Sequence, residues 1–212
     1  MKVGILDSGD VAKALGKGFL ATGHEVMLGS RDIEKVRGWS EHAAAKAGTF
    51  AETAGFGEVV VLAVKGTIAV DAVKLAGVSA LAGKTVIDAN NPIADAPPVN
   101  GVLQYFTGPN ESLMERLQAA APEAHFVKAF SCVGNAFMFR PNFPGGPPTM
   151  FICGNDAGAK TQVRGILTDF GWETADMGKV ESARAIEPLC QLWCAPGLSG
   201  GTWTHAFKLL QL

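Results

Sequence analysis

A glycine-containing motif that could hold a nucleotide lies near the start of the chain, where residues 5–16 read ILDSGDVAKALG. Dinucleotide-binding proteins carry the pattern G-x-G-x-x-G between their first strand and first helix. The first glycine makes the tight turn, the second lets the backbone approach the pyrophosphate, and the third, where alanine is accepted, allows close packing. Here the three positions hold Asp7, Gly9 and Ala12. The second and third residues fit the pattern, whereas the first introduces a carboxylate.

The charge of Asp7 opposes a bound phosphate. At a separation of about 6 Å and an effective dielectric constant of about 20, the repulsion amounts to roughly 3 kcal/mol. The backbone N–H groups at the start of the following helix act in the opposite direction, because a helix N-terminus attracts anions. The motif therefore predicts a nucleotide site that Asp7 weakens.

The end of the second expected strand indicates which nucleotide would bind. About 20 residues after the glycine motif, NAD-selective proteins place an Asp or Glu that binds the ribose hydroxyls. Here the sequence reads GSRDIEK, in which Ser30 and Arg31 offer a hydroxyl and a guanidinium, and Lys35 follows one helical turn later. These groups suit a 2′-phosphate, so we expect NADP rather than NAD. In the alternative interpretation, Ser30 caps the second helix and Arg31 is solvated.

Apolar runs alternate along the chain with stretches in which apolar residues recur at helical spacing. Gly23 is placed to end the first helix, and Asn110 to cap the fourth. The alternation predicts an α/β fold with a doubly wound, parallel Rossmann-type sheet. We expect strands over residues 2–6, 24–30, 58–64, 84–92, 125–131, 149–154 and 172–178, and helices over 10–23, 31–48, 67–77, 110–122, 156–171 and from 181 onward.

A segment rich in proline and glycine, residues 140–148, predicts a boundary or a crossing loop. We expect an NADP-binding domain over residues 1–140. Residues 141–212 would then form a small C-terminal α/β portion.

The composition argues against several classes of protein. The 212 residues are 48% hydrophobic and 18% charged, enough to bury a substantial core. A formal net charge of −2 gives no reason to expect nucleic acid or an anionic membrane as a partner. The first ten residues do not resemble a signal peptide, and no apolar run of about 18 residues predicts a membrane span. Four cysteines do not suggest a disulfide framework, so the cytoplasm is the expected location.

Seven segments of the chain occur together, in the same order, in one known family. They are VGILDSGDVAKAL, GHEVMLGSRD, EVVVLAV, TVIDANNP, VKAF, FICGNDAGAK and LTDFGWETADMG. The chain resembles the NADP oxidoreductases related to coenzyme F420-dependent NADP reductases, from residue 1 to about residue 195. The resemblance implies a homodimer that passes a hydride between NADPH and a deazaflavin bound in the cleft between its two parts. The sequence of the chain departs from the family at Asp7 and Ala12, where glycine is usual, and in the loop SCVGNA at residues 131–136.

The resemblance also assigns residues to each part of the cofactor site. The four groups of residues given next would contact, in this order, the pyrophosphate, the 2′-phosphate, the riboses and the two sides of the nicotinamide. They are Ser8, Gly9, Asp10 and Val11; Ser30, Arg31 and Lys35; Ala63, Val64 and Lys65; and Asn91 with Pro92, opposite Ser131, Cys132, Val133 and Gly134.

No catalytic acid, base or nucleophile is expected, because hydride transfer needs the reacting carbons within about 3.5 Å and the cofactors supply the reactivity. The four histidines lack metal-ligand spacing, so no metal site is expected. For Cys190 and Cys194, four residues apart, packing is favoured over a redox or metal pair. Lys128 could donate a proton in a hydroxy acid or imine dehydrogenase. Its place in an apolar run favours instead a side chain that extends to solvent from a strand edge.

These observations predict an NADPH-dependent oxidoreductase whose second substrate is a small planar electron carrier, either coenzyme F420 or a flavin such as FMN or FAD. A reductase of a small organic substrate, such as a hydroxy acid or an imine, is one alternative. A nucleotide-binding sensor without turnover, in which Asp7 has weakened the site, is another.

Overall fold

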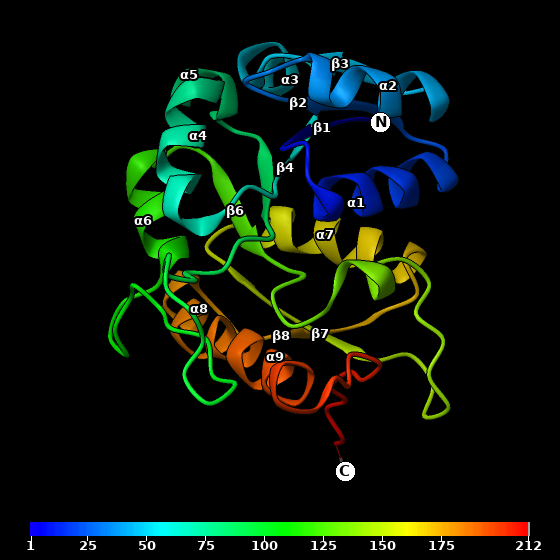
Figure 1. The fold of residues 1–212 in the computed structure, drawn as a ribbon. Helices are drawn as coiled ribbons and strands as arrows, with labels where there is room; N and C mark the ends of the chain where they lie inside the picture. Colours follow the sequence, from blue (N-terminus) through cyan, green and yellow to red (C-terminus); the bar gives the residue numbers. More distant parts are fainter. Residues whose placement is uncertain (212) are drawn as a thin grey trace.

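The computed structural model describes residues 1–211, whose eight strands form one sheet in the order β3-β2-β1-β4-β5-β6-β7-β8. The first six strands are parallel. Strand β7 runs antiparallel to β6, and β8 is parallel to β7. The strands are β1 (Lys2–Leu6), β2 (Glu25–Gly29), β3 (Lys46–Gly48), β4 (Val59–Leu62), β5 (Thr85–Asp88), β6 (His125–Lys128), β7 (Thr149–Gly154) and β8 (Glu173–Asp176) (Figure 1).

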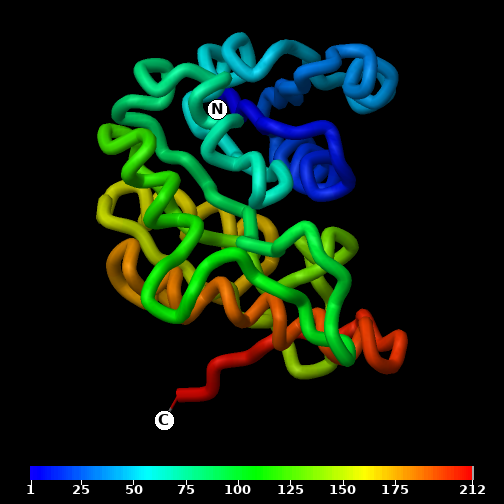
Figure 2. Tube along the Cα trace, turned by 60° about the vertical axis from the view of Figure 1, so that its left-hand side comes forward, coloured from blue at the N-terminus to red at the C-terminus, as the bar shows by residue number. Residues whose placement is uncertain are grey.

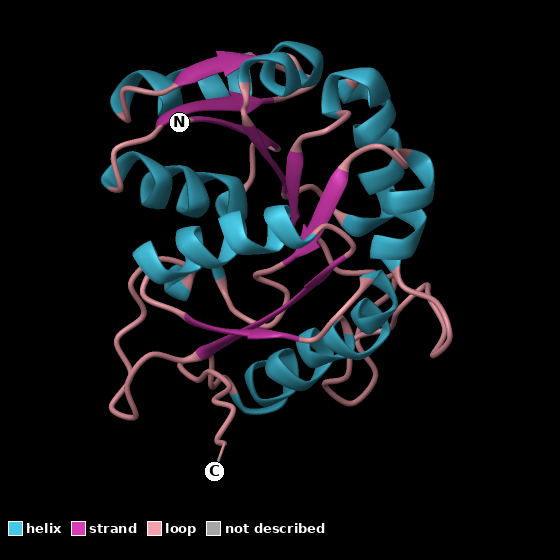
Figure 3. Cartoon of the chain, turned by 180° about the vertical axis from the view of Figure 1, so that it is seen from behind, coloured by secondary structure: helices cyan, strands magenta, loops and turns pink. Residues whose placement is uncertain are grey.

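Helices cover both faces of this sheet (Figure 3). Helices α1, α2 and α7 pack on one face, and α3, α4, α5, α6 and α8 pack on the other. The helices are α1 (Asp10–Ala21), α2 (Glu34–His42), α3 (Phe50–Phe56), α4 (Ala69–Ala76), α5 (Val78–Leu81), α6 (Leu113–Ala120), α7 (Ala157–Asp169), α8 (Ala183–Ile186) and α9 (Pro188–Gly200), with 3₁₀ turns η1 (Gly66–Ile68), η2 (Asn135–Phe137) and η3 (Val180–Ser182).

The central strand β4 shows why its sequence is an unbroken apolar run. Val59 and Val61 belong to the core on the α1 side, whereas Val60 and Leu62 belong to the core on the α4 side. All four side chains are completely buried. A parallel strand covered by helices on both faces has no solvated side, so no polar residue alternates with the apolar ones.

The strand register brings the carboxyl ends of five strands to one edge of the sheet. Leu6 at the end of β1 pairs with Gly29 of β2 and with Leu62 of β4. Leu62 in turn pairs with Asp88 of β5, and Asp88 pairs with Lys128 of β6. The loops that follow these strands therefore leave the sheet together. The chain order reverses on either side of β1, and open α/β sheets bind ligands in the crevice at such a point.

The predicted α/β fold with a doubly wound, Rossmann-type sheet is confirmed. The sheet was expected to be parallel throughout, whereas β7 runs antiparallel to β6 and the sheet is mostly parallel. Residues 31–57 contain β3 and α3 in addition to α2, which is shorter than expected. Helix α6 is capped by Ser112 rather than by Asn110, because Ser112 and Glu115 bind each other's backbone N–H groups in a capping box.

The C-terminal ends of α1 and of the last helical region can be compared with those predicted from the sequence. Gly23 follows α1 with a φ of +80°, a conformation that suits glycine, so the expected end of this helix is confirmed. The C-terminal helical region ends at Gly200, and residues 201–211 form no helix. Figure 2 shows this last segment at the opposite end of the molecule from the N-terminus. The proposed boundary near residue 140 stays a prediction.

Candidate functional site

The loop between β1 and α1 holds the modified glycine motif. Gly9 occupies the N-cap position of α1, and its backbone N–H donates to the Asp7 carboxylate at 3.1 Å. The backbone N–H of Asp7 donates to Gly29 O, also at 3.1 Å, which ties the loop to β2. Ala12 is completely buried, as the packing position of the motif requires. Asp7 thus occupies a backbone donor at the very place where this type of loop receives a pyrophosphate.

The electrostatics of Asp7 reflect its half-buried position. Desolvation raises the pKa of Asp7 above its ordinary value. The backbone hydrogen bonds of Ser8 and Gly9 and the charges of Lys13 and Arg31 act in the opposite direction. The carboxyl group is therefore more easily protonated than a solvated aspartate, although cations lie near it.

A small pocket of about 80 Å³ joins the loop after β1 to the residues that follow β2. Ser30 is buried, and the side chains of Arg31 and Lys35 make no ion pair within residues 1–211. Two unpaired cations beside a hydroxyl suit a 2′-phosphate. The pocket is lined by Asp7, Ser8, Ser30, Arg31, Asp32, Lys35, Phe50, Val64 and Ile68.

The alternative role of Ser30 as a helix cap is not what the structure shows. Helix α2 begins at Glu34, with Ile33 at its N-cap position and no side-chain cap. The Ser30 hydroxyl accepts instead from the backbone N–H of Asp32 at 3.1 Å. Sequence reasoning missed Asp32 itself, an acidic residue in the same pocket, although it stands next to Arg31 in the chain.

The residues after β4 lie beside this pocket. Ala63 and Val64 are buried, and Val64 contributes to the pocket wall. Lys65 is exposed and forms an ion pair with Asp95. Its charge is therefore already partnered by a protein carboxylate, unlike the charges of Arg31 and Lys35.

The turn after β5 and the loop after β6 meet, as the family resemblance implies. The Asn91 side-chain amide donates to the backbone carbonyl of Ser131 at 3.0 Å. Pro92, Ser131, Cys132 and Val133 are buried. Asn91 Oδ1 and Ser131 Oγ are buried without a hydrogen-bond partner among residues 1–211. Buried polar atoms normally have partners, so two unpaired ones in adjoining segments indicate a place for a polar ligand.

Other residues of the resemblance lie at the margins of this edge. Gly134 packs against Trp193: a Cβ atom at this position would come within 2.6 Å of the indole. Its backbone is therefore covered by α9. Asp10 is exposed at the start of α1 and lines a different hollow, and Val11 packs against the core on the α1 side.

Lys128 differs from its expected position. Its side chain is completely buried, where solvent exposure at a strand edge was expected. The ammonium group contacts Asp88 Oδ2 at 2.6 Å and Glu187 Oε1 at 2.9 Å, and it donates to Asn90 O at 2.9 Å. Burial acts to lower the pKa of Lys128, but the two carboxylates outweigh it and hold the pKa above its ordinary value. Lys128 is thus a buried cation held by two carboxylates and a backbone carbonyl.

The buried ion cluster of Lys128, Asp88 and Glu187 helps to position the loops of the candidate site. Lys128 holds the carbonyl of the residue before Asn91, so it fixes the turn that meets Ser131. Glu187 accepts from two backbone N–H groups at the start of α6, those of Leu113 and Met114, each at 3.0 Å. Sequence reasoning missed Asp88 and Glu187. Asp88 could have been found as the strand partner of Lys128, whereas nothing in the local sequence indicates Glu187.

The two cysteines of α9 face each other with their sulfur atoms 4.0 Å apart, as free thiols. Cys190 is buried and Cys194 is half-buried. Within residues 1–211, no group of three or more His, Cys, Asp or Glu side chains is placed to hold a metal ion. In the same part of the chain, no helix has the length and apolar character needed to cross a membrane.

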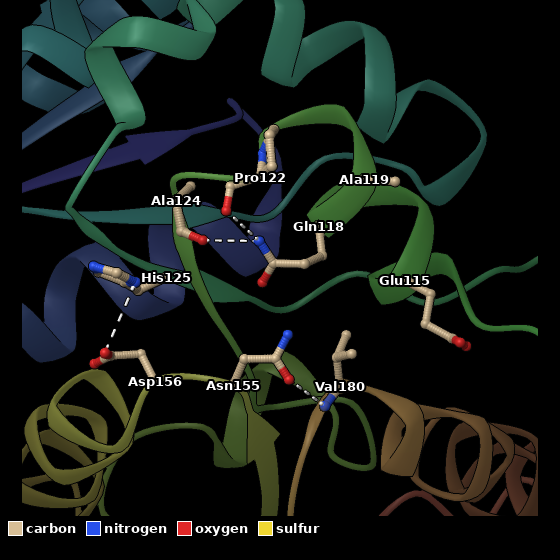
Figure 4. A pocket seen from close by; sticks show the side chains of 9 residues that line it. All are labelled: Glu115, Gln118, Ala119, Pro122, Ala124, His125, Asn155, Asp156 and Val180. Carbon is tan, nitrogen blue, oxygen red and sulfur yellow. Dashed lines mark hydrogen bonds and ion pairs between the residues drawn. The ribbon is translucent and has the colours of Figure 1, made fainter.

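A separate cavity of about 360 Å³ lies at the other end of β6 (Figure 4). Its polar side chains are committed to structural bonds: Gln118 donates to Ala124 O, Asn155 accepts from the backbone of Val180, and Asp156 caps α7. His125 and Asp156 approach each other at 4.0 Å across one side. This cavity lies at the amino end of the strand, away from the carboxyl-end crevice, and we assign no ligand to it.

Fold and pocket together define the class of protein. A parallel sheet in the order 3-2-1-4-5-6, a glycine loop at the first helix and unpaired cations after the second strand are the features of an NADP-binding Rossmann protein.

Comparison with known proteins then gives the family. Residues 2–92 match the family model described as NADP oxidoreductase, coenzyme F420-dependent. A crystal structure from Arthrobacter sp. FB24, described as a candidate F420-dependent NADP reductase, is 30% identical, covers 100% of both chains and has a TM-score of 0.93. The chain belongs to this family and is an NADP-dependent oxidoreductase.

The chain also resembles parts of two larger proteins. Metalloreductase STEAP3 from Rattus norvegicus is 32% identical over 189 residues, which are 89% of this chain and 36% of that protein. The chain thus spans about a third of that relative's length. An imine reductase from Streptomyces aurantiacus is 16% identical with a TM-score of 0.64, covering 93% of this chain and 63% of its own. At that identity the likeness shows the fold alone.

Proposed function

We propose that the protein transfers a hydride between NADP(H) and the flat ring of a deazaflavin such as coenzyme F420, or of a flavin. The observation that carries this proposal is the hydrogen bond between Asn91 and Ser131, which joins two loops at the carboxyl edge of the sheet. The pocket that we assign to NADP lies at the same edge. A nicotinamide ring that extends from this pocket toward β5 and β6 would meet these loops.

The unpaired atoms in these loops match the chemistry of a nicotinamide. Its carboxamide carries N–H donors and a carbonyl acceptor. Asn91 Oδ1 can accept from such a donor, and the Ser131 hydroxyl can donate to such a carbonyl. These two residues would orient the ring without taking part in bond making.

The chemistry itself asks little of the protein. The dihydronicotinamide supplies the hydride, and the chain contributes binding, orientation and exclusion of water. The family description favours a deazaflavin as acceptor. The relative named a metalloreductase adds a reason to test whether electrons reach a metal ion.

The test is an acceptor screen that follows the loss of NADPH absorbance. Coenzyme F420, FMN, riboflavin, a ferric chelate, a set of imines and a set of keto acids are each offered to the purified protein, and NADPH binding is measured separately by fluorescence. Oxidation of NADPH by F420 or a flavin supports the proposal. Oxidation only by imines or keto acids identifies a small-substrate reductase instead. Binding without any turnover identifies a sensor, which the occupied donor at Gly9 would favour.

The assembly and location of the protein are part of the same proposal. The family resemblance supports a homodimer, and light scattering coupled to size-exclusion chromatography tests it. The cysteine usage supports a cytoplasmic location, and fractionation of the host cell tests it.

A further inference from the structure

A groove of about 450 Å³ lies on the outer side of α1, between that helix, α2 and η2. Trp39 and Phe139 provide aromatic surface in it, and Lys13 and Lys17 provide charge. A second hollow of about 380 Å³ shares Lys17 and Trp39, so the depression continues along α1 toward His42. We call the first hollow the Lys17 groove.

The Lys17 groove begins beside the proposed site of hydride transfer. Asp10, on its rim, directly follows the pyrophosphate loop. Asn135, also in its lining, directly follows the loop that contains Ser131. The groove therefore starts next to both loops of the site and leads away from them over the surface of α1.

The charges in the groove lack protein partners. Lys13 and Lys17 lie one helical turn apart on the same face of α1, because residues four apart on a helix are neighbours. Within residues 1–211, neither lysine forms an ion pair or a side-chain hydrogen bond. Most of the other lysines in these residues do. The acid in the lining is Asp10, so the groove carries a net positive charge.

We propose that the Lys17 groove binds the phosphate-bearing chain of the electron acceptor while the acceptor's ring lies against the nicotinamide. This inference rests on the proposed function. The phosphates of NADPH would be bound by the β1 loop and by Ser30, Arg31 and Lys35, which line a different pocket from the Lys17 groove. A flavin mononucleotide and a phosphodiester-bearing deazaflavin share what the groove recognises, a flat ring joined by a flexible polyol chain to a phosphate.

The test compares FMN with riboflavin, which has the same ring and chain but no phosphate. In the wild-type protein the KM for FMN should lie below that for riboflavin. Two charge-assisted contacts would contribute to this difference. The double variant Lys13→Gln/Lys17→Gln should therefore raise the KM for FMN relative to the KM for riboflavin by roughly ten- to a hundredfold. Lys17→Gln alone should give part of this effect and avoids the influence of Lys13 on Asp7. Raised salt should diminish the wild-type preference for FMN, because screening weakens exposed ionic contacts.

Lys74→Gln is the matched control, since Lys74 is an exposed helical lysine on α4, paired only with Asp71. It should leave the ratio unchanged. Equal losses for FMN and riboflavin in the groove variants, or weaker NADPH binding in Lys17→Gln, would overturn the assignment. So would a ratio that does not move.

Direct binding separates this inference from the proposed function. Fluorescence anisotropy of FMN measures its affinity without turnover, for the wild type and for Lys17→Gln. If no flavin or deazaflavin oxidises NADPH, the proposed function fails, yet weaker FMN binding in Lys17→Gln would still support a phosphate site in the groove. Equal FMN affinity in the two proteins would refute the groove even if hydride transfer is observed. F420, measured in the same way, shows whether the groove serves the deazaflavin as well as FMN.

Discussion

The carboxylate of Asp7 accepts a hydrogen bond from the backbone N–H of Gly9, two residues further on. A side chain of the protein thereby occupies a donor that a dinucleotide fold normally offers to a phosphate. NADP binding must displace this contact or tolerate the carboxylate beside the pyrophosphate.

Asp7→Gly should tighten NADPH binding by about three- to tenfold, because it frees the Gly9 N–H and removes a repulsion that is partly screened at this half-buried position. Asp7→Asn is the control that removes the charge and keeps a side-chain acceptor. Fluorescence titration in low and high salt measures both, and the gain should shrink in high salt. Weaker binding by Asp7→Gly would mean that the Asp7–Gly9 contact is needed to shape the loop.

NADP⁺ binding should strengthen as the pH falls toward the raised pKa of Asp7. A nearby pyrophosphate favours the neutral carboxyl, so protonation and binding promote each other, and the affinity gained at low pH is lost as the pH rises through that pKa. The 2′-phosphate also titrates, near about pH 6. Calorimetry between pH 5 and pH 8 on the wild type and Asp7→Asn isolates the contribution of Asp7. Identical pH profiles for the two proteins would contradict this prediction.

Arg31→Ala should weaken NADPH binding by roughly ten- to a hundredfold, since a charge-assisted contact to the 2′-phosphate typically contributes about 1.5–3 kcal/mol. NADH binding should change little, because NADH lacks this phosphate. Titration with both cofactors measures the difference. Arg37→Ala is a suitable control, as Arg37 pairs with Glu34 on an exposed helix face. Equal losses for NADPH and NADH would show that Arg31 does not contact the 2′-phosphate.

Gly134→Ala should lower the free energy of unfolding by about 1–3 kcal/mol, the usual cost of overpacking, because the new Cβ would meet the indole of Trp193 at 2.6 Å. Gly145→Ala is the control, since nothing lies within 4 Å of its Cβ position. Urea denaturation measures both variants. A Gly134→Ala protein as stable as the wild type would mean that Trp193 can move away from this loop.

Lys128→Met should cost about 3–5 kcal/mol of folding stability, because it leaves two buried carboxylates without their shared cation. Lys74→Met, at an exposed pair, should cost well below 1 kcal/mol. Denaturant unfolding compares the two. If Lys128→Met does not fold, Glu187→Gln, which retains a hydrogen-bonding side chain, gives a smaller loss by the same measurement. Equal stabilities for Lys128→Met and Lys74→Met would contradict a structural role for the cluster.

The sequence was sufficient to predict seven of the eight strands and the grouping of the residues proposed to bind the nucleotide, but not the short edge strand β3. Apolar runs such as residues 58–64 are governed by local periodicity, and loops that follow parallel strands converge because of the sheet itself. The approach of Ser8, Ser30 and Arg31 to one pocket follows from these two facts.

The remaining features depend on contacts between residues distant in the chain. Glu187 reaches the start of α6 across 73 and 74 positions, and no pattern around it indicates this. Lys128 was misread because an apolar run usually carries a lysine only at its solvent-facing edge, whereas here two carboxylates neutralise it in the core. The packing of Trp193 on Gly134 likewise depends on where α9 lies, which periodicity does not specify.

The buried cluster also bears on whether the nucleotide-binding part can be treated as an independent module. A fragment ending near residue 140 would retain Lys128 and Asp88 but lose Glu187, so the buried ammonium would lose one of its two carboxylate contacts and two helix N–H groups would lose their acceptor. We therefore expect residues 1–140 to be less stable alone than in the whole chain. Domain exchange or truncation at the proline-rich loop would therefore remove a component of the core, and not merely the cover of the acceptor cleft.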